Sequence, residues 1–448
     1  MTDDRYGGYK DPTLDWLKRQ GLEIWDEIEI DQDTSTLKGV ILPRSDLADS
    51  DFISLKLTTG YNIGFNVMNI HSVRKISHIK GEYKIPKIEV SQNPELPFVP
   101  ILGCGGTIAS RLDYRTGGTI PALTPEELFS SFPEIGKLAR IETRLLFDIF
   151  SENINLGHYR TILSTIENLI REKKPQGIVL THGTDTMAFT AAALSFAITN
   201  SPIPIVITGS QRSSDRPSSD AYFNLYNSIL YASSSQAKRG VVVIMHEESS
   251  DTSCAIHNGT RVRKMHSSRR DTFKAIGGDP IGRIENGKIM HSVDDNHSNF
   301  KESEDKRLRI SKNFEKNVGL IYHYPGIQPG LIEYHRDAGY KGIVFAGTGL
   351  GHVSSNLISV IEEVIDNGMI IAMTTQCLHG YTNLSVYESG RRLMNAGVIP
   401  LFNMLPETAY IKLSYLLGNY QRSIKIKELL TTNLKGEILQ REKFQGFL

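Results

Sequence analysis

The chain has 448 residues, of which 40% are hydrophobic and 22% are charged. This length allows two or three domains with cores of their own, and the composition is that of an ordinary globular protein. The 50 Lys and Arg residues equal the 50 Asp and Glu residues, which excludes a global positive field that would attract nucleic acid. Any nucleic-acid contact would therefore have to be local or made by a partner.

The cysteine pattern and the hydropathy favour a cytoplasmic protein. The three cysteines, Cys104, Cys254 and Cys377, are far apart, which argues against a disulfide framework and against a metal-ligand spacing. No window approaches the roughly 18 consecutive apolar residues that a membrane-spanning helix needs. We therefore expect no membrane contact.

Residues 1–85 predict a small β-barrel. Short stretches of alternating apolar and polar residues recur about every ten positions between Gly and Pro turns, as in small all-β domains. They lie at residues 27–30, 39–43 and 52–57, and a turn at 59–64 leads into a further strand. The polar residues 1–13 predict a flexible start without the apolar core of a signal peptide.

Residues 86–97 predict a linker, and residues 98–300 predict an α/β domain. Pro86, Pro94 and Pro97 stand among charges and favour an extended connection. Apolar runs of strand length then alternate with helical segments. The runs are 98–102, 178–180, 203–208 and 241–245, and the main helical segments are 159–171 and 186–198. This order predicts a parallel sheet with helices on both faces, whose strand-to-helix loops meet at one edge.

A polar, highly charged stretch at 286–316 precedes a second α/β domain, predicted for residues 317–422. Its strands are expected at 318–321, 342–345 and 369–373. The apolar spacing of Ile424, Ile426 and Leu429 predicts that residues 423–448 form a helical tail.

Two of the predicted strands run into loops that contain a threonine. Residues 98–102 lead to GCGGTIAS with Thr107, and residues 178–180 lead to THGTD with Thr184 and Asp185. Taken alone, a Thr beside an Asp at the start of a helix is more often an N-cap. Two hydroxyls and a carboxylate at one sheet edge, however, predict a nucleophile site. A Thr hydroxyl needs a basic partner, and a lysine held beside the carboxylate could take its proton.

The candidate lysine, Lys264, lies in the basic run 261–271 (RVRKMHSSRRD). On composition alone this run predicts a solvated surface stretch. Together, however, GGTIAS, HGTDT and the basic run resemble the L-asparaginase/glutaminase family. Within it, the segments GYNIG, THGTDTM and GTRVRKMHSSRRD are most similar to the D subunits of archaeal glutamyl-tRNA(Gln) amidotransferases. The resemblance covers nearly the whole chain and implies a small N-terminal β-barrel followed by two asparaginase-like α/β domains with parallel sheets.

The resemblance also implies roles for individual residues. Thr107 is the threonine that attacks the side-chain amide, and Thr184, Asp185 and Lys264 form the set that activates the nucleophile or a water. The order in which the threonines act stays open.

Three further residues are implied to bind or enclose the substrate. Tyr114 belongs to a lid at 113–118, which without the family would be an ordinary loop. Ser151 and Glu152 lie where the family binds the α-amino and α-carboxyl groups, although Ser-Glu before a helix is also a common cap. The chain departs from the expected pattern at Ser267, Thr272 and Tyr381-Thr382.

The implied function is the glutaminase half-reaction of a ligase complex. Glutamine would be hydrolysed through an acyl-threonine. A partner, the amidotransferase E subunit, would use ATP and magnesium to activate Glu-tRNA(Gln) and accept the ammonia. This chain would bind no metal or cofactor and would form a homodimer within a two-plus-two heterotetramer. Two alternatives stay open: a free-standing L-asparaginase with an appended barrel, and a non-catalytic scaffold.

Overall fold

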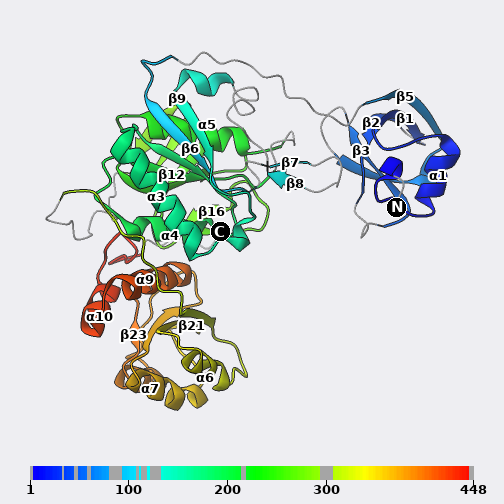
Figure 1. The fold of residues 1–448 in the computed structure, drawn as a ribbon. Helices are drawn as coiled ribbons and strands as arrows, with labels where there is room; N and C mark the ends of the chain where they lie inside the picture. The colour runs from blue at the N-terminus through cyan, green and yellow to red at the C-terminus, as the bar shows by residue number, and fades with distance from the viewer. Residues whose placement is uncertain are drawn as a thin grey trace.

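A computed structural model describes residues 4–32, 35–44, 49–57, 62–79, 93–106, 110–112, 119–121, 133–212, 218–292 and 306–442. Figure 1 shows three units in chain order: an N-terminal sheet, a large α/β domain and a smaller α/β domain. The order of sheet classes agrees with the prediction from the sequence.

The N-terminal unit is a five-stranded antiparallel sheet in the order β4-β3-β2-β1-β5. Its strands are β1 Asp26–Gln32, β2 Ser35–Ile41, β3 Phe52–Leu57, β4 Asn62–Asn66 and β5 Ser72–His78, with helix α1 at Thr13–Gln20 and single turns η1 Asp4–Tyr6 and η2 Val67–Asn69. Alternate residues such as Ile53 and Leu55 are buried in a core of their own. The sheet is consistent with a small barrel-like domain, although no ladder within the described residues joins β4 to β5.

The prediction of a flexible polar start is wrong for residues 4–12. Tyr9 is buried in the N-terminal core. Its hydroxyl donates to Leu42 O at 2.8 Å and accepts from Ser54 N at 2.9 Å. The segment is ordered by partners 33 and 45 positions away, which a local reading of polarity does not reveal.

The large domain contains an eight-stranded sheet in the order β18-β17-β14-β13-β12-β10-β6-β9. The parallel part consists of β6 Phe98–Gly103, β9 Arg140–Leu145, β10 Ile178–Thr181, β12 Pro204–Thr208 and β13 Gly240–His246. Strands β14 Ser253–Asn258, β17 Gly282–Glu285 and β18 Lys288–His291 extend the sheet in the antiparallel sense, which was not predicted.

Helices cover both faces of this sheet, as its apolar runs predict. Ile205 and Ile207 of β12 pack in the cluster with α3 Leu156–Glu172 and α4 Met187–Ala197. Val206 points to the other face, where α5 Ala221–Ser233 lies. Short elements complete the domain: hairpins β7 Ser110–Leu112 with β8 Thr119–Pro121 and β15 Val262–Lys264 with β16 Phe273–Ala275, the pair β11 Ile198–Thr199 with β19 Arg309–Ile310, and turns η4 Pro133–Lys137 and η5 Ser151–Asn153.

The smaller domain is a parallel four-stranded sheet with helices on both faces. Its strands are β20 Val318–Tyr322, β21 Gly342–Gly347, β22 Ile370–Thr375 and β23 Ile399–Pro400. One face packs against α6 Gly330–Asp337, η6 Ser355–Leu357, α7 Ile358–Asp366 and α8 Glu388–Asn395, and the other against α9 Pro406–Asn419 and α10 Ser423–Thr431. Helix α9 also packs on α4 of the large domain, where Phe189 lies against Tyr410 and Phe196 against Tyr415.

The predicted helical tail is only partly correct. Helix α10 ends at Thr431, and residues 432–442 are neither helix nor strand. This segment runs back to the large domain, where Glu437 O and Lys435 O accept hydrogen bonds from Arg261 and Asn258. The spacing of apolar residues alone predicted a helix for residues 432–442, because it carries no information about these distant hydrogen-bond partners.

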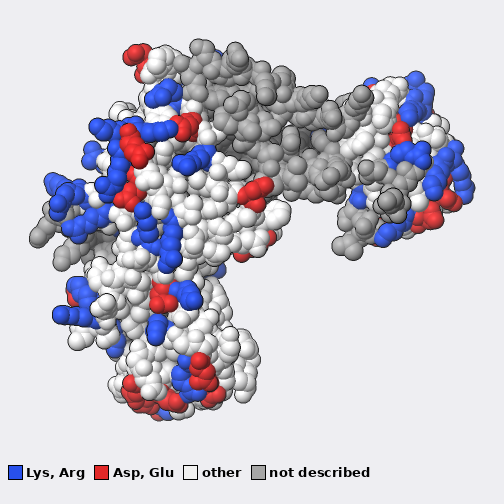
Figure 2. Space-filling model, in the orientation of Figure 1, with Lys and Arg blue, Asp and Glu red and all other residues white. Residues whose placement is uncertain are grey.

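The surface carries both signs of charge. On the face drawn in Figure 2, acidic side chains lie among the basic ones. Around α3, for example, Glu167 lies 2.7 Å from both Arg171 and Lys312, and Glu142 lies 2.5 Å from Lys173. Among the helices of the described ranges, none combines the length and the apolarity that a membrane crossing requires.

Candidate functional site

Three loops begin side by side at the carboxyl edge of the large sheet. In the ladders of β10, Thr181 pairs with Gly103 of β6 on one side and with Thr208 of β12 on the other. Because parallel strands end at the same level, the segments after residues 103, 181 and 208 share one edge. This is where open α/β sheets bind their ligands.

Glycines let two of these loops touch backbone to backbone. Gly105 and Gly106 have φ values of +76° and +85°, a backbone conformation that residues with a side chain rarely adopt. A Cβ on Gly106 would lie 2.5 Å from the backbone of Gly183. The chain beyond β6 therefore reaches the turn that precedes Thr184. Thr107, one residue further on, lies outside the described residues.

The structure brings Thr184, Asp185 and Lys264 together. Lys264 Nζ donates to Thr184 Oγ1 at 2.9 Å and to Asp185 Oδ1 at 2.8 Å, across about eighty positions of sequence (80 and 79). Thr184 is buried, the Lys264 side chain is 16% exposed, and Asp185 is exposed. An amine within hydrogen-bond distance of a hydroxyl is suitably placed to exchange a proton with it. The Asp185 carboxylate balances the positive charge of the Lys264 amine when that amine is protonated.

Ser151 also lies at this edge. It is buried in η5, and its carbonyl accepts a hydrogen bond of 2.7 Å from Thr186 Oγ1. A Cβ on Gly183 would come within 2.7 Å of Ser151 Cβ, so the serine packs directly against the turn before Thr184. Glu152 follows it with an exposed side chain. Tyr114, predicted in the lid, lies outside the described residues.

His182 was not predicted as a site residue, although it stands inside the THGTDT motif. Its ring is buried; Nδ1 lies 2.6 Å from Gly183 O, and Nε2 lies 2.8 Å from Thr190 Oγ1. Burial lowers the pKa of His182 to about 4, so the ring is neutral at pH 7. A neutral ring that donates from Nδ1 and accepts at Nε2 ties the turn to α4. Thr190, a polar residue in a mostly apolar helical stretch, is the signal that could have revealed it.

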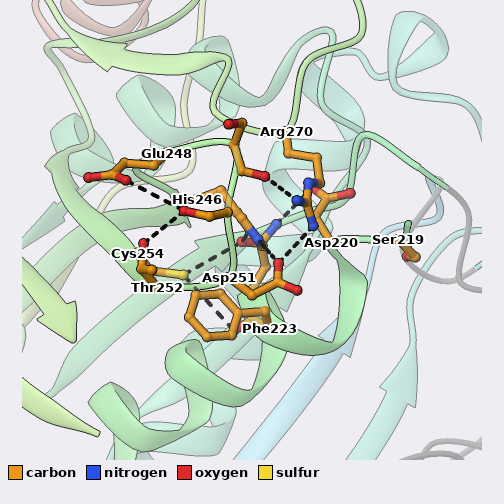
Figure 3. A network of polar contacts seen from close by, with 12 residues as sticks. Ser219, Asp220, Phe223, His246, Glu248, Asp251, Thr252, Cys254 and Arg270 are labelled. Atoms are coloured by element: carbon orange, nitrogen blue, oxygen red, sulfur yellow. Dashed lines mark hydrogen bonds and ion pairs between the residues drawn. The ribbon is translucent and has the colours of Figure 1, made fainter. Parts of the chain in front are cut away.

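A second polar network links loops at this edge of the sheet (Figure 3). The carboxylate of Asp220 accepts from the backbone of Gln211 and Arg212 at 3.0 Å, and Asn224 lies between it and His246. His246 Nε2 lies 2.9 Å from Asp251 Oδ1, which Arg270 Nη1 approaches to 2.7 Å. The network thus connects the loop after β12 to the loop that follows Lys264.

Thr272, one of the residues that depart from the expected family pattern, has a structural role in the loop that follows Lys264. Thr272 Oγ1 accepts from His266 N at 2.7 Å and donates to His266 O. The hydroxyl closes the turn between β15 and β16, so this change keeps the loop after Lys264 compact.

Within the described residues, the group that could offer three metal ligands lies in the N-terminal sheet. Ligand atoms of Glu23, Asp26 and His78 lie within 4.8 Å of one another. However, Asp26 Oδ1 already lies 2.7 Å from Lys75 Nζ, and Asp26 Oδ2 accepts from Glu23 N at 2.9 Å. An ammonium in that position disfavours a second cation, so these residues do not fit a metal well.

Three family models match the chain in succession. The GatD N-terminal domain matches residues 22–76, the asparaginase N-terminal domain matches 98–296, and the glutaminase/asparaginase C-terminal domain matches 317–430. The site described above lies within the second of these matches.

Similar proteins are found among curated sequences and solved structures. The glutamyl-tRNA(Gln) amidotransferase D subunit of Pyrococcus furiosus is 43% identical over 440 residues, covering 97% of this chain and 99% of its own length. The corresponding D subunit of Sulfolobus acidocaldarius is 43% identical over 435 residues, covering 97% and 95%. The structure of the thermostable L-asparaginase from Thermococcus kodakarensis aligns with a TM-score of 0.67 and 32% identity, covering 76% of this chain and 99% of that one.

Proposed function

Because the chain belongs to the family of glutamyl-tRNA(Gln) amidotransferase D subunits, we propose that it is the glutaminase of a tRNA-dependent amidotransferase. It hydrolyses glutamine to glutamate and supplies the ammonia that converts Glu-tRNA(Gln) to Gln-tRNA(Gln). The observation that carries this proposal is the contact of Lys264 with Thr184 and Asp185 at the carboxyl edge of an asparaginase-type sheet.

The proposed chemistry proceeds through an ester. A threonine hydroxyl attacks the γ-amide carbon and its proton passes to a base. The base then gives this proton to the amide nitrogen as the C–N bond breaks, and ammonia leaves. Water then cleaves the γ-glutamyl ester and releases glutamate. In this scheme Thr107 carries the acyl group, and Lys264 moves the proton at Thr184 Oγ1 or at a water beside it. Ser151 and Glu152 hold the α-amino and α-carboxyl groups, and Tyr114 supports Thr107.

The synthetic half of the reaction is assigned to a partner. The amidotransferase E subunit binds Glu-tRNA(Gln), uses ATP and magnesium to activate the γ-carboxylate, and receives the ammonia. The present chain then needs no cofactor, and the complex as a whole is a ligase. We propose a dimer of this chain at the centre of a two-plus-two assembly. The balanced charge of the chain supports leaving most tRNA contacts to the partner.

The two alternatives are less well supported. A free-standing L-asparaginase would share the two α/β domains, but the match of residues 22–76 to the GatD N-terminal domain favours the amidotransferase assignment. A non-catalytic scaffold would have no need for the converging contacts of Lys264.

Ammonia release tests the proposal. The full chain is assayed with glutamine and with asparagine, alone and with its partner and Glu-tRNA(Gln). We expect glutamine turnover that rises when the loaded partner is present. Lys264→Ala should lower it by at least about 100-fold, as for loss of a proton-transfer group.

Lys274→Ala is the matched control for Lys264→Ala. Lys274 lies on the paired strand β16, its side chain is 46% exposed, and Nζ donates to Glu247 O. Its replacement should leave turnover within about twofold of wild type. Strong asparagine turnover indifferent to tRNA would indicate a free asparaginase, and no turnover with either amide would indicate a scaffold.

A further inference from the structure

The strand that carries Lys264 is short and is held from outside. Strand β15 has three residues and pairs with β16 over three positions. A two-stranded ribbon of this length is not stable on its own in water. Lys264 must nevertheless keep Nζ within 2.9 Å of Thr184 and 2.8 Å of Asp185. Some other contact must therefore fix the strand.

Arg261, directly before β15, supplies such a contact. It is 1% exposed and is among the largest fully buried side chains of the described residues. Its guanidinium donates to three backbone carbonyls that belong to different parts of the molecule. They are Ile276 O beyond β16 (Nε, 2.9 Å), Asn403 O of the smaller domain (Nη1, 2.5 Å) and Glu437 O (Nη1, 3.2 Å).

Glu437 belongs to residues 432–442, which we call the C-terminal strap. The strap lies beyond the residues matched by the glutaminase/asparaginase C-terminal model, 317–430. It also contacts the chain just before Arg261. Asn258 Nδ2 and Thr260 Oγ1 both donate to Lys435 O at 3.1 Å, and Lys435 Nζ donates to Ile198 O at 2.9 Å.

The strap is fixed in turn by the smaller domain. Lys412 Nζ and Glu437 Oε1 form a 2.6 Å ion pair in which neither side chain is exposed. Leu439 N donates to Asn403 Oδ1 at 3.1 Å, and Tyr381 OH donates to Leu439 O at 3.2 Å. At its far end, Glu442 Oε2 accepts from Gly380 N at 2.8 Å, and the Glu442 carboxylate faces Arg261.

We propose that Arg261 is a positioning residue for the glutaminase reaction and that the C-terminal strap holds it in place. Together they set the position of Lys264 Nζ, three residues along the chain from Arg261. The inference rests on the proposed function. The physical reason is that a misplacement of about 1 Å at a reacting group can lower the rate by about 100-fold.

The test compares variants of the full chain in complex with its partner. Arg261→Gln should lower kcat for glutamine about 10- to 100-fold while KM stays within about twofold. Arg261→Lys, which keeps the positive charge, should recover part of the loss, and Glu442→Gln should lower kcat less than Arg261→Gln. The control is Arg283→Gln on β17, whose side chain is 52% exposed, and it should leave kcat unchanged.

A double variant separates positioning from simple stabilisation. If Arg261 acts through Lys264, Arg261→Lys should cause little further loss of the residual turnover when Lys264→Ala is already present. If the double variant loses turnover by the full product of the two single-variant factors, the inference is overturned. Arg261 variants with normal kcat would overturn it as well. If Arg261→Gln does not fold, Arg261→Lys and Glu442→Gln decide by the same criteria. Absence of glutamine turnover in the wild type would overturn the proposed function as well, whereas normal wild-type turnover with unaffected variants overturns this inference alone.

Discussion

His182 illustrates how a single buried ring can hold a reactive turn. It accepts from the Thr190 hydroxyl and donates to the carbonyl of Gly183, the residue before Thr184. It does so only as the neutral form, because a charged imidazole in this buried position would lack hydration and could not accept from Thr190. The turn before Thr184 is therefore sensitive to acid.

The lowered pKa of His182 predicts a pH dependence of stability. The folded-state pKa is about 4, against an ordinary value of 6.5, so the unfolded state binds more protons between these values. The contribution to the free energy of unfolding is fully present above pH 6.5 and is lost as pH falls towards 4, by about 2 kcal/mol at pH 5.

Denaturant unfolding of the full chain at pH 7 and pH 5 would measure this loss. In His182→Gln the difference between the two pH values should shrink by about 2 kcal/mol. Part of the difference should remain, because burial also lowers the pKa of His257, to about 3. An equal difference in wild type and variant would contradict the prediction.

The sequence predicted some of these residues and could not predict others. Lys264 was predicted only through family resemblance, since the composition of residues 261–271 alone indicated a solvated stretch. That reading is wrong for Arg261, which is buried because its acceptors lie 142 and 176 positions further along the chain. Local composition carries no information about such partners. Thr107 and Tyr114 stay predictions.

At the scale of elements, apolar runs of strand length were the sequence feature that best predicted the secondary structure. Strands β6, β10, β12 and β13 were predicted near their observed bounds because helices cover both faces of a parallel sheet. The antiparallel strands β14, β17 and β18 were missed. Residues 253–258 (SCAIHN) mix polar and apolar side chains, and their strand character arises from pairing with β13 and β17.

The close approach of Gly106 and Gly183 predicts a specific sensitivity at the site. Gly106→Ala should introduce both backbone strain, of roughly 1–2 kcal/mol, and a clash with the Gly183 backbone at 2.5 Å. The variant should lower the thermal midpoint and reduce glutamine turnover, because the loop must move away from the turn before Thr184.

Gly368→Ala is the matched control for Gly106→Ala. Its φ of +93° imposes similar strain, but a Cβ there would meet no atom within 4 Å. This variant should lose stability without losing turnover. Equal turnover in the two variants would contradict the role assigned to the Gly106–Gly183 contact.

At the scale of the whole molecule, the two α/β domains are joined by a polar interface beside an apolar one. On α4, Phe189 contacts Tyr410 of α9 edge to face, and Phe196 stacks on Tyr415. Beside them lies the buried Lys412–Glu437 pair, where Lys412 also donates to Leu430 O and Thr432 O. Removing Lys412 takes away the opposite charge and leaves the buried Glu437 carboxylate with only the backbone N–H groups of Leu434 and Lys435 as partners among the described residues.

Lys412→Met should therefore lower the free energy of unfolding by about 3–5 kcal/mol. Adding Glu437→Gln should recover part of this loss, since the stranded carboxylate is then neutral. Lys425→Met, which breaks the exposed Lys425–Glu428 pair, should cost no more than about 1 kcal/mol. Urea unfolding of all three variants measures the differences, and a double variant less stable than Lys412→Met would argue against a stabilising ion pair.

Arg261 and Glu437 lie 176 positions apart in the sequence, so the strap is synthesised long after the residues of the site. During translation, Thr184, Asp185 and Lys264 leave the ribosome well before the strap is synthesised. Contacts between residues so distant in sequence close late, because the intervening chain must first be ordered. A nascent chain therefore exposes the reactive side chains without the support that aligns them. If Arg261 and the strap position Lys264 as proposed, amide hydrolysis reaches its full rate only once the strap has docked, so the growing polypeptide consumes little glutamine before it can join an assembly.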